Sequence, residues 1–443
     1  MTAAIRAAVD KHSVEVWLGE AARRLGSLSF ARQGQRQSSA FSYEPEWLSD
    51  PERFAVSPDL PLTSDRQFRK APSQNDSVFH FAIADTAPDG WGCRVIARDH
   101  ARRRKLAATK GQTVDGGAIT EMDYLLAVDD VSRIGALRLR TVESGRSGRF
   151  VRVIEEGGGG TPPLLELADM LSASHAVERG TETVRDLRYL RGRGTSLGGL
   201  RPKCSVIDDD GRLAIGKFPS IHDDRAVTQG EVLALRLASR AGITAAQARI
   251  VHCEGVPVAL VRRFDRTPVG RVPYLSATAM LQASRNQDHA YSEIAEHILR
   301  VSPDPRSDLA ELWRRIVFNM LITNVDDHLH NHGFLHVGQG QWRLAPAFDL
   351  NPFPDKDREL KTWLTEETGP SGSIDEALAV ASQFHLDRPV ALKILSEVTH
   401  AVCAWRAVAR TPAVAMSTRE IEAFEPAFEH PGLAAARRSL AAS

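Results

Sequence analysis

The sequence predicts an α+β fold with a small β-rich N-terminal part, a small α/β lobe and a larger, mainly helical lobe. Residues 14–70 alternate short apolar runs with turn residues, as short antiparallel strands do. Residues 164–265 alternate helical and strand patterns around a glycine-rich turn, and residues 290–443 have mainly helical periodicity. We therefore divide the chain into three domains, at residues 1–140, 141–265 and 266–443.

The composition is that of a globular chain without a global charge. The 443 residues are 42% hydrophobic, which is enough for two or three packed cores. Basic and acidic residues both total 56, so no net charge favours nucleic acid or an anionic membrane as a partner of the whole surface. The start lacks the apolar segment of a signal peptide, and no run of about 18 apolar residues follows. We therefore expect a cytoplasmic protein with no membrane partner.

The cysteines are scattered along the chain without a C-x2-C pair. This spacing argues against a zinc ribbon and against a disulfide framework. We expect reduced, mostly packed thiols at Cys93, Cys204, Cys253 and Cys403.

Three segments complete the prediction for the N-terminal half. A charged helix is expected after the turn "PDGWG" at 88–92, and a second short helix at "MDYLLAVDD", 122–130. The glycine and proline content of residues 145–163 indicates a linker.

A glycine-rich turn precedes the first strand of the α/β lobe. Closely spaced glycines, among them Gly198 and Gly199, let backbone N–H groups approach phosphate oxygens, and Lys203 supplies positive charge. The spacing is neither a Walker A sequence nor the G-x-G-x-x-G of protein kinases. A plain hairpin turn therefore stays open as an alternative.

A lysine and a glutamate follow on the next two elements. The strand "LAIGK" places Lys217 on the same face as Leu213 and Ile215, and a lysine on an apolar face needs an anion. A helix is expected from Glu231 to Gly242, with Glu231 in its first turn. Protein kinases hold ATP phosphates with such a strand lysine and helix glutamate, while two solvent-exposed charges are the alternative.

A buried helix is expected immediately before the most polar segment of the chain. Leu309, Leu312, Ile316 and Met320 recur at helical spacing, and Asp308 with Glu311 forms a D-x-x-E capping pattern at the start. The C-terminal end of this helix delivers the segment "NVDDHLHNHGF" at 324–334.

This polar segment has the spacing of a phosphotransfer site. Asp326 lies five residues before Asn331, and Asp349 follows at the end of a later strand. Protein kinases supply a catalytic carboxylate and two magnesium ligands in this order. We assign Asp326 to orient or deprotonate the attacking hydroxyl, and Asn331 and Asp349 to hold Mg²⁺. Asp327 is only four residues from Asn331 and is not assigned a chemical role, while His328 would bond a phosphate or fix the loop.

A metal-dependent hydrolase is the rival interpretation of the same segment. Zinc or a two-metal centre could be bound by side chains from His328, His330, His332, His336, Asp326, Asp327 and Asp349. This interpretation leaves the glycine turn, Lys217 and Glu231 without a role, so consistency along the chain favours phosphotransfer.

These segments resemble the HipA family, the serine/threonine kinase toxins of bacterial type II toxin-antitoxin modules. The resemblance lies in "SLGGLRPK" (196–203), "IGKFP", "VRRFDR", "DDHLHN" and "APAFDL". The N-terminal sequences "FSYEPEWL", "FAVSPDLPL" and "DTAPDGWG" also resemble the domain that precedes the kinase in this family. The similarity therefore extends over nearly the whole chain, and it implies a bilobal, protein-kinase-like fold of the HipA type.

The resemblance also implies roles for individual residues in an ATP- and Mg²⁺-dependent kinase. Lys217 would bind ATP phosphates, Arg262 and Phe264 would present backbone groups to adenine, and Lys203 matches a loop lysine. Ser196 falls where the family has an autophosphorylated serine whose modification ejects the loop and silences the kinase. The catalytic and metal centre would be Asp326, His328, Asn331 and Asp349.

Substrates and partners are implied in the same way. The family's characterised substrates are aminoacyl-tRNA synthetases, whose phosphorylation stops translation and growth, and its partner is a small helix-turn-helix antitoxin of the HipB type that binds operator DNA. The chain has no evident helix-turn-helix of its own, so DNA contact would be indirect. The basic run at 94–110 would be a solvated helix face or touch DNA phosphates in such a complex.

Two departures from the family accompany the match. Asp327 and His330 stand where relatives have small or basic residues, and the residues after Ser196 vary. A regulatory co-repressor without turnover is a further alternative, although every residue needed for the chemistry is present.

Overall fold

The chain divides into two compact units, each described here by itself. The computed structural model describes residues 10–73, 76–88, 90–111, 118–142, 148–151, 164–191, 199–284, 287–355 and 357–441. The first unit is Met1–Asp209 with Asp265–Leu275 and Ser284–Asn286, and the second is Asp210–Phe264 with Ser276–Ala283 and Gln287–Ser443. None of the helices in these described ranges has the length and apolar character needed to cross a membrane.

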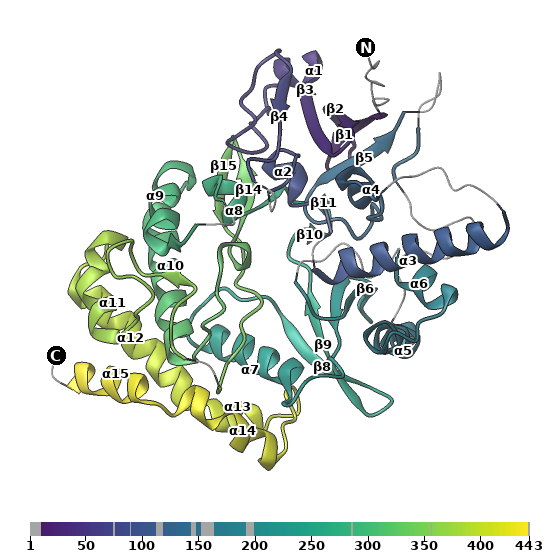
Figure 1. Ribbon diagram of the computed structural model, residues 1–443. Coiled ribbons are helices and arrows are strands. Elements are labelled where there is room, and N and C mark those ends of the chain that lie inside the picture. The colour runs from purple at the N-terminus through teal and green to yellow at the C-terminus, as the bar shows by residue number, and fades with distance from the viewer. Residues whose placement is uncertain are drawn as a thin grey trace, which may run out of the picture. The chain divides into compact units, whose positions relative to one another are not determined.

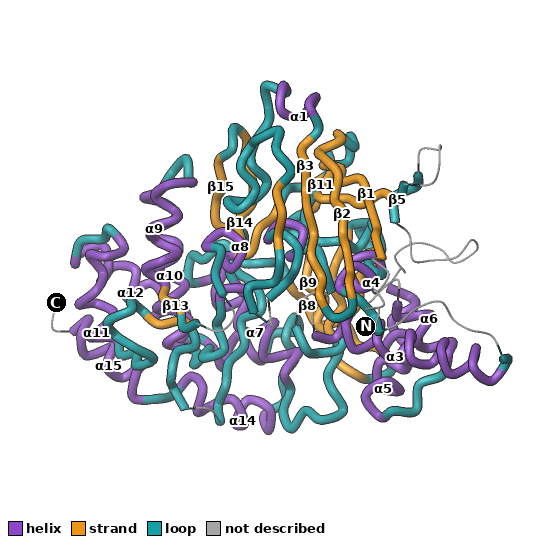
Figure 2. The backbone as a smooth tube through the Cα atoms, turned by 45° about the horizontal axis from the view of Figure 1, so that its top comes forward, coloured by secondary structure: helices purple, strands orange, loops and turns teal. Residues whose placement is uncertain are grey.

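An antiparallel sheet forms the centre of the first unit, as the alternating pattern predicts. Its five strands lie in the order β4-β3-β2-β1-β5, and the long strands β1, β2 and β3 run side by side in Figures 1 and 2. Val16, Leu28 and Phe30 are buried on one face of the sheet. The strands are β1 (Asp10–Leu18), β2 (Arg23–Gln33), β3 (Arg36–Tyr43), β4 (Gln67–Arg69) and β5 (Leu137–Thr141).

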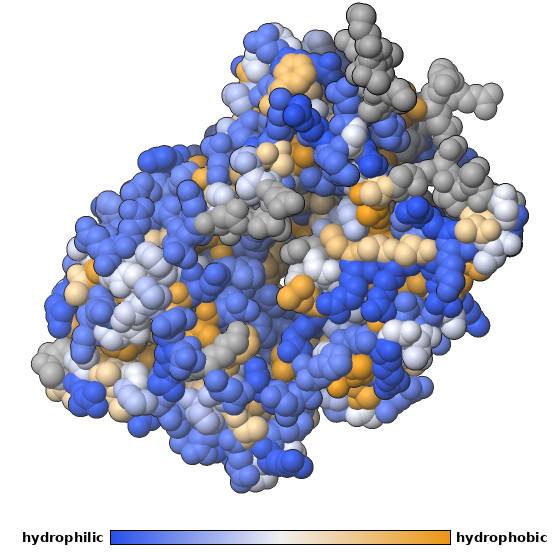
Figure 3. Space-filling view, in the orientation of Figure 1, coloured by the Kyte–Doolittle hydropathy of each residue, from blue (hydrophilic) through white to orange (hydrophobic). Residues whose placement is uncertain are grey.

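Short helices complete the first unit, and the expected charged helix is α3 (Gly90–Thr109). Trp91, Val95 and Ile96 are buried in its first half, whereas nearly all residues from 101 to 111 are exposed. Figure 3 shows strongly hydrophilic side chains along this helix, next to a band of apolar ones. The other helices and short strands are α1 (Pro45–Ser49), α2 (Phe81–Ala84), α4 (Glu121–Leu126), η1 (Leu164–Glu166), α5 (Leu167–Arg179), α6 (Val184–Arg191), β6 (Lys203–Ile207), β10 (Arg266–Thr267) and β11 (Gly270–Arg271).

Strands of the second unit support the helix that carries Glu231. Strand β9 (Val256–Arg262) lies antiparallel between β7 (Leu213–Lys217) and β8 (Ala248–Cys253). Helix α7 (Val227–Arg240) packs against β8 and β9. The sequence predicts Glu231 in the first turn of this helix. That prediction is wrong, because the helix begins four residues before Glu231. The Thr228 hydroxyl donates to the Pro257 carbonyl at 3.1 Å, a tertiary contact that no local pattern reveals.

The rest of the second unit is mainly helical, as expected. Helices α10 (Pro305–Leu321) and α12 (Arg388–Cys403) pack together, and α15 (Pro431–Ala441) packs against α12; Figure 1 shows this cluster. The remaining elements are α8 (Ala277–Leu281), α9 (Tyr291–Val301), η2 (Leu329–Asn331), η3 (Ala381–Phe384), α11 (Ile374–Val380), α13 (Trp405–Ala409), α14 (Thr418–Phe428), β13 (His289–Ala290), β14 (Gly333–Gly338), β15 (Gln341–Leu344) and β16 (Thr362–Trp363). Strand β12 (Tyr274–Ser276) begins in the first unit, and its last residue belongs to the second.

Helix α10 is buried as predicted, but its N-terminal cap is not the expected one. The Asp304 side chain accepts the Ser307 N–H, and Pro305 occupies the first helical turn. Asp308 is buried and instead forms an ion pair of 2.7 Å with Arg343 of β15. The predicted D-x-x-E cap is therefore wrong, because Asp308 has a stronger partner far away in the sequence.

Candidate active site

Lys217 lies between two carboxylates in the second unit. Its Nζ is 2.5 Å from Glu231 Oε1 and 2.7 Å from Asp349 Oδ1. Burial alone would lower the pKa of Lys217, but the Asp349 and Glu231 carboxylates together raise that pKa above its ordinary value. The lysine is therefore charged at neutral pH, and the two carboxylates leave the cluster with one net negative charge.

Each member of this cluster comes from a different element. Lys217 ends strand β7, and Glu231 lies in the second turn of α7. The segment leading to Asp349 is fixed by backbone hydrogen bonds of Ala347 to Thr244 and Ala246, at 2.7 and 2.9 Å.

Asp349 itself has a left-handed backbone conformation. Its φ is +56°, which is uncommon for a residue other than glycine and is found most often where the surrounding structure enforces it. Asn351 Nδ2 donates to the Asp349 carbonyl at 3.0 Å and stabilises this turn.

Asp326 and Asn331 lie together in the loop after α10. Asp326 is exposed, and Asn331 in η2 directs its Nδ2 to the Asp326 carbonyl at 3.4 Å. The loop begins at Thr323, which has a φ of +54° and is held by a 2.9 Å hydrogen bond from its hydroxyl to the Ala427 carbonyl.

Asp327 has the opposite environment to its neighbour. It is 3% exposed, and its Oδ2 accepts hydrogen bonds from Tyr291, from Asn319 at 2.8 Å and from His332 at 2.8 Å. Burial alone would raise the pKa of Asp327, but His332 and the hydrogen bond from Tyr291 lower it below its usual range. Burial, together with Asp327, raises the pKa of Tyr291 well above its ordinary value. Asp327 is thus an ionised, inward-facing group.

The histidines of the segment have different partners. His330 Nδ1 is 3.0 Å from the Thr278 hydroxyl, His332 bonds Asp327, and His336 Nε2 accepts the Gly340 N–H at 3.2 Å. His328 is partly buried, and its Nδ1 has no hydrogen-bond partner. Within the described ranges, no three His, Cys, Asp or Glu side chains are grouped as metal ligands. The divergent histidine contacts give the hydrolase interpretation no ligand set there.

Arg262 and Phe264, the residues expected to present backbone groups to adenine, lie at the end of strand β9 and just after it. The Arg262 N–H donates to the Gln247 carbonyl at 2.8 Å, so this N–H is already engaged. The Arg262 guanidinium bonds Gln247 and Asp210. The Phe264 ring packs on Phe348, with centroids 5.5 Å apart, next to Asp349.

The glycine turn belongs to the first unit and is described only in part. Ser196 and Gly198 lie outside the described residues. Gly199 has a φ of +95°, and a Cβ there would lie 2.6 Å from the Lys203 Nζ, so a side chain at this position would displace the lysine. The Gly199 carbonyl accepts the Trp91 N–H at 2.9 Å, which connects the turn to the "PDGWG" segment. Lys203 itself is buried at the start of β6.

The donor atoms of the second unit suit Mg²⁺ and a nucleotide. Asp349 and Asn331 offer carboxylate and amide oxygens, the hard ligands that Mg²⁺ prefers. Asp326 adds an exposed carboxylate, and Lys217 provides a fixed positive charge for a phosphate.

Sequence reasoning missed the asparagines that support these groups. Asn324 Nδ2 donates to Asn319 Oδ1 at 3.1 Å, and the Asn351 N–H donates to Asn324 Oδ1 at 3.3 Å. Asn319 and Asn324 are nearly fully buried. A polar residue on the apolar face of the predicted helix before Asp326 was the available signal, since a buried amide needs a partner.

Comparisons with known proteins agree with this fold. The chain has a TM-score of 0.67 and 16% identity with a chain in the solved structure of the Shewanella oneidensis toxin-antitoxin system HipA, HipB and its operator DNA complex, covering 97% of both chains. The protein therefore has the bilobal, kinase-like fold predicted from the sequence.

The family assignment follows from two family models. The HipA N-terminal domain matches residues 14–115, and the HipA-like C-terminal domain matches residues 195–405. The chain belongs to the HipA family.

Curated relatives match over shorter stretches. The chain is 26% identical over 182 residues to "Putative kinase Y4mE" of Sinorhizobium fredii, and 24% identical over 188 residues to a "Putative kinase" of Haemophilus influenzae. These stretches are 35% and 37% of this chain. The chain spans only 41% and 55% of the lengths of these two relatives.

Proposed function

We propose that this protein is an ATP- and Mg²⁺-dependent serine/threonine protein kinase that acts as a growth-arresting toxin. The observation that carries the proposal is the contact of Lys217 with both Glu231 and Asp349. This is the arrangement of strand lysine, helix glutamate and metal-binding aspartate that kinases use. The names of the curated relatives support the same reaction class.

The residues of the second unit have separate tasks in this reaction. Asp326 accepts the proton of the attacking serine hydroxyl, whose oxygen forms the new bond to the γ-phosphorus as the bond to ADP breaks. Asp349 and Asn331 would hold Mg²⁺, which when bound would neutralise charge on the phosphate oxygens. Lys217 binds the phosphates, and His328 fixes the loop or bonds a phosphate.

Further residues are proposed to contact the nucleotide, as in the HipA family. Backbone groups of Arg262 and Phe264 meet the adenine, and the glycine turn covers the phosphates. That turn contributes Ser196, Gly198, Gly199 and Lys203. Autophosphorylation of Ser196 removes the turn from the nucleotide and silences the enzyme.

The proposed partners follow from the family. The substrate is an aminoacyl-tRNA synthetase in the cytoplasm, and the regulator is a small antitoxin of the HipB type. The solved Shewanella complex, which contains HipA, HipB and operator DNA, supports such an antitoxin and an indirect contact with DNA.

Substitution of either key carboxylate tests the reaction. We expect Asp326→Ala and Asp349→Ala to reduce transfer of labelled phosphate from ATP to protein by about 100- to 10,000-fold, since each removes a group required in the transition state. Asp224→Ala is the matched control, because this aspartate is 81% exposed in its side chain and lies outside the cluster. Undiminished labelling by both variants would refute the assignment.

A second measurement separates turnover from binding and identifies the substrate. Phosphoproteomes after induced expression of wild type and Asp326→Ala are compared, and sites present only with wild type are the substrates. Binding of Mg-ATP and operator DNA without any such site would instead favour the co-repressor.

A further inference from the structure

A continuous chain of polar side chains joins the two parts of the candidate site in the second unit. Asn351 contacts Asp349, with its Nδ2 3.4 Å from Oδ1, and its N–H donates to Asn324. Asn324 bonds Asn319, which in turn donates to Asp327 Oδ2 at 2.8 Å. The carboxylate proposed to bind metal is therefore connected by successive hydrogen bonds to the residue adjacent to Asp326.

The cost of burying Asp327 indicates that it is more than a packing residue. An ionised carboxylate withdrawn from water is strongly unfavourable unless several donors satisfy it. Here three donors converge on a single oxygen, from Tyr291 on α9, Asn319 on α10 and His332 after η2. An apolar side chain could fill the same space without the cost of desolvating a carboxylate. We therefore infer that the Asp327 carboxylate fixes the conformation of the loop.

The orientation of the His332 ring is set by this arrangement. His332 is 3% exposed, and its buried Nδ1 has no partner, whereas its Nε2 is 2.8 Å from Asp327. Nε2 therefore carries the hydrogen that is donated to the Asp327 carboxylate.

The loop backbone is held on both sides of Asp327. The Thr362 hydroxyl donates to the Asp327 carbonyl at 2.7 Å, and the Lys361 N–H donates to the Val325 carbonyl at 3.2 Å. Asn331 donates to the Asp326 carbonyl. Three successive carbonyls are thus fixed, while the Asp326 side chain stays exposed.

We propose that Asp327 is a positioning residue for phosphotransfer. Its buried carboxylate and the chain Asn319–Asn324–Asn351 hold the Asp326 loop in a fixed relation to Asp349. Asp327 touches no substrate. The effect of Asp327 on the rate of phosphate transfer rests on the kinase activity proposed above. Its effect on the order of the Asp326 loop does not depend on that activity.

Asp327→Asn is the first test. The variant keeps the side-chain volume but replaces the two acceptor oxygens of the carboxylate by one oxygen and one NH2 group. That NH2 group is a donor and cannot accept the hydrogen bonds of Asn319 and His332. We expect kcat for phosphate transfer to fall by about 10- to 100-fold, the usual effect of losing a supporting hydrogen-bond partner, with the KM for ATP unchanged. A wild-type kcat, or a loss equal only to the unfolded fraction measured by circular dichroism, would overturn the proposal.

Thr362 provides a matched pair that leaves the buried charge intact. Thr362→Val removes the hydroxyl that bonds the Asp327 carbonyl and keeps the shape, whereas Thr362→Ser keeps the hydroxyl. We expect Thr362→Val to lower kcat at unchanged KM, and Thr362→Ser to have a kcat close to that of wild type. Equal kcat values for the two variants would contradict the proposal.

Hydrogen exchange distinguishes a failure of this proposal from a failure of the kinase assignment. The Asn331 and His332 amides donate within the loop, to His328 and Leu329, so their exchange reports loop opening. We expect faster exchange at both amides in Thr362→Val than in Thr362→Ser. If wild type transfers no phosphate, the kinase proposal fails, and the exchange comparison alone then tests the role of Asp327 in holding the loop. Equal exchange rates in Thr362→Val and Thr362→Ser would overturn that role.

Discussion

Lys217 determines the electrostatics of the candidate site at the scale of single residues. It is held between Glu231, with a side chain 5% exposed, and Asp349, with a side chain 33% exposed. One positive charge cannot neutralise two carboxylates, so the cluster keeps a negative potential that attracts a divalent cation. The same lysine prevents direct repulsion between the two carboxylates.

Removing the Lys217 charge should therefore destabilise the fold as well as the activity. We expect Lys217→Met to lower the free energy of unfolding by about 3–5 kcal/mol, because the buried Glu231 carboxylate loses its partner. The double variant Lys217→Met/Glu231→Gln should recover part of this loss. Urea denaturation measures all three proteins, and equal stability of the single variant and wild type would show that the ion pair does not form in solution.

The sequence identified some residues of this site and not others. Lys217 and Glu231 were predicted from their elements, and the structure brings them together with Asp349. Spacing also favoured Asp326 over Asp327, and the two residues differ sharply in exposure. The partners Tyr291 and Thr362 were not predictable, because they lie 36 and 35 residues from Asp327 and no periodicity links them to it.

At the scale of elements, the C-terminal end of α10 is held by the last helices of the chain. His430 Nε2 lies 3.1 Å from the Leu321 carbonyl, and its Nδ1 accepts the Gly432 N–H at 3.1 Å. The Thr323 hydroxyl bonds the Ala427 carbonyl. Unpaired carbonyls at a helix end need such partners, and here they also fix where the Asp326 loop begins.

The titration of His430 should make this contact sensitive to acid. Burial, with a contribution from Arg358, lowers the pKa of His430 from 6.5 to about 4. The neutral imidazole therefore adds stability at pH values above 6.5, and this contribution is lost as the pH falls from 6.5 toward 4. We expect the free energy of unfolding to fall less over this range in His430→Gln, whose amide can still donate to Leu321. Parallel pH profiles for the two proteins would contradict the prediction.

Element prediction succeeded where the pattern is periodic and failed at the ends. The buried helix before Asp326 was found from its apolar spacing, whereas the start of α7 and the cap of α10 were wrong. Both ends are set by tertiary contacts, of Thr228 with Pro257 and of Asp308 with Arg343. A local sequence window does not contain those partners.

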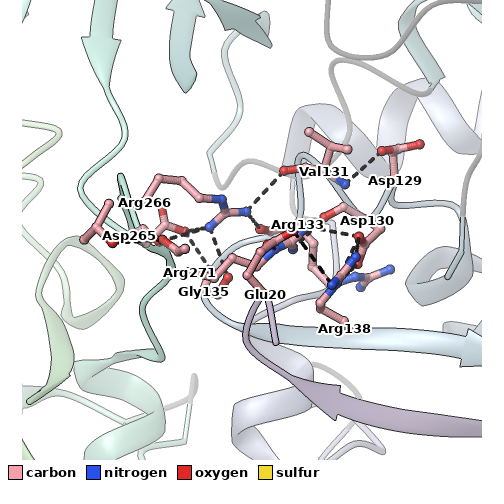
Figure 4. A network of polar contacts seen from close by, with 12 residues as sticks. Glu20, Asp129, Asp130, Val131, Arg133, Gly135, Arg138, Asp265, Arg266 and Arg271 are labelled. Carbon is pink, nitrogen blue, oxygen red and sulfur yellow. Dashed lines mark hydrogen bonds and ion pairs between the residues drawn. The ribbon is translucent and has the colours of Figure 1, made fainter. Parts of the chain in front are cut away.

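At the scale of the whole molecule, the first unit is discontinuous in sequence. The chain leaves it after Asp209 and returns at Asp265, directly after Phe264. Asp265 accepts the Gly135 N–H at 2.7 Å, and Arg271 bonds Asp130 at 3.0 Å (Figure 4). The proposed boundaries at residues 140 and 265 remain predictions, but a fragment ending at 209 would lack these contacts.

Arg266 is the centre of the returning segment. Its guanidinium donates to the carbonyls of Val131 at 3.1 Å and Arg133 at 2.7 Å, and it pairs with Asp265 at 2.8 Å (Figure 4). The Asp265 side chain is only 3% exposed, so it cannot replace this partner with water. The fork of five N–H donors suits several acceptors at once, which a lysine ammonium cannot match.

Substitution of Arg266 therefore tests whether the return of the chain stabilises the first unit. We expect Arg266→Met to lower the free energy of unfolding of this unit by about 3–5 kcal/mol, because the buried Asp265 carboxylate loses its ion pair with Arg266. The free energy of unfolding of Arg266→Lys should lie between those of Arg266→Met and wild type, since the charge remains but the carbonyl contacts are lost. Arg36→Met, at an exposed position on β3, is the control for losing an arginine. Thermal unfolding followed by circular dichroism gives the ranking, and a midpoint of Arg266→Met equal to that of Arg36→Met would show that the segment Asp265–Leu275 is attached to the unit without stabilising it.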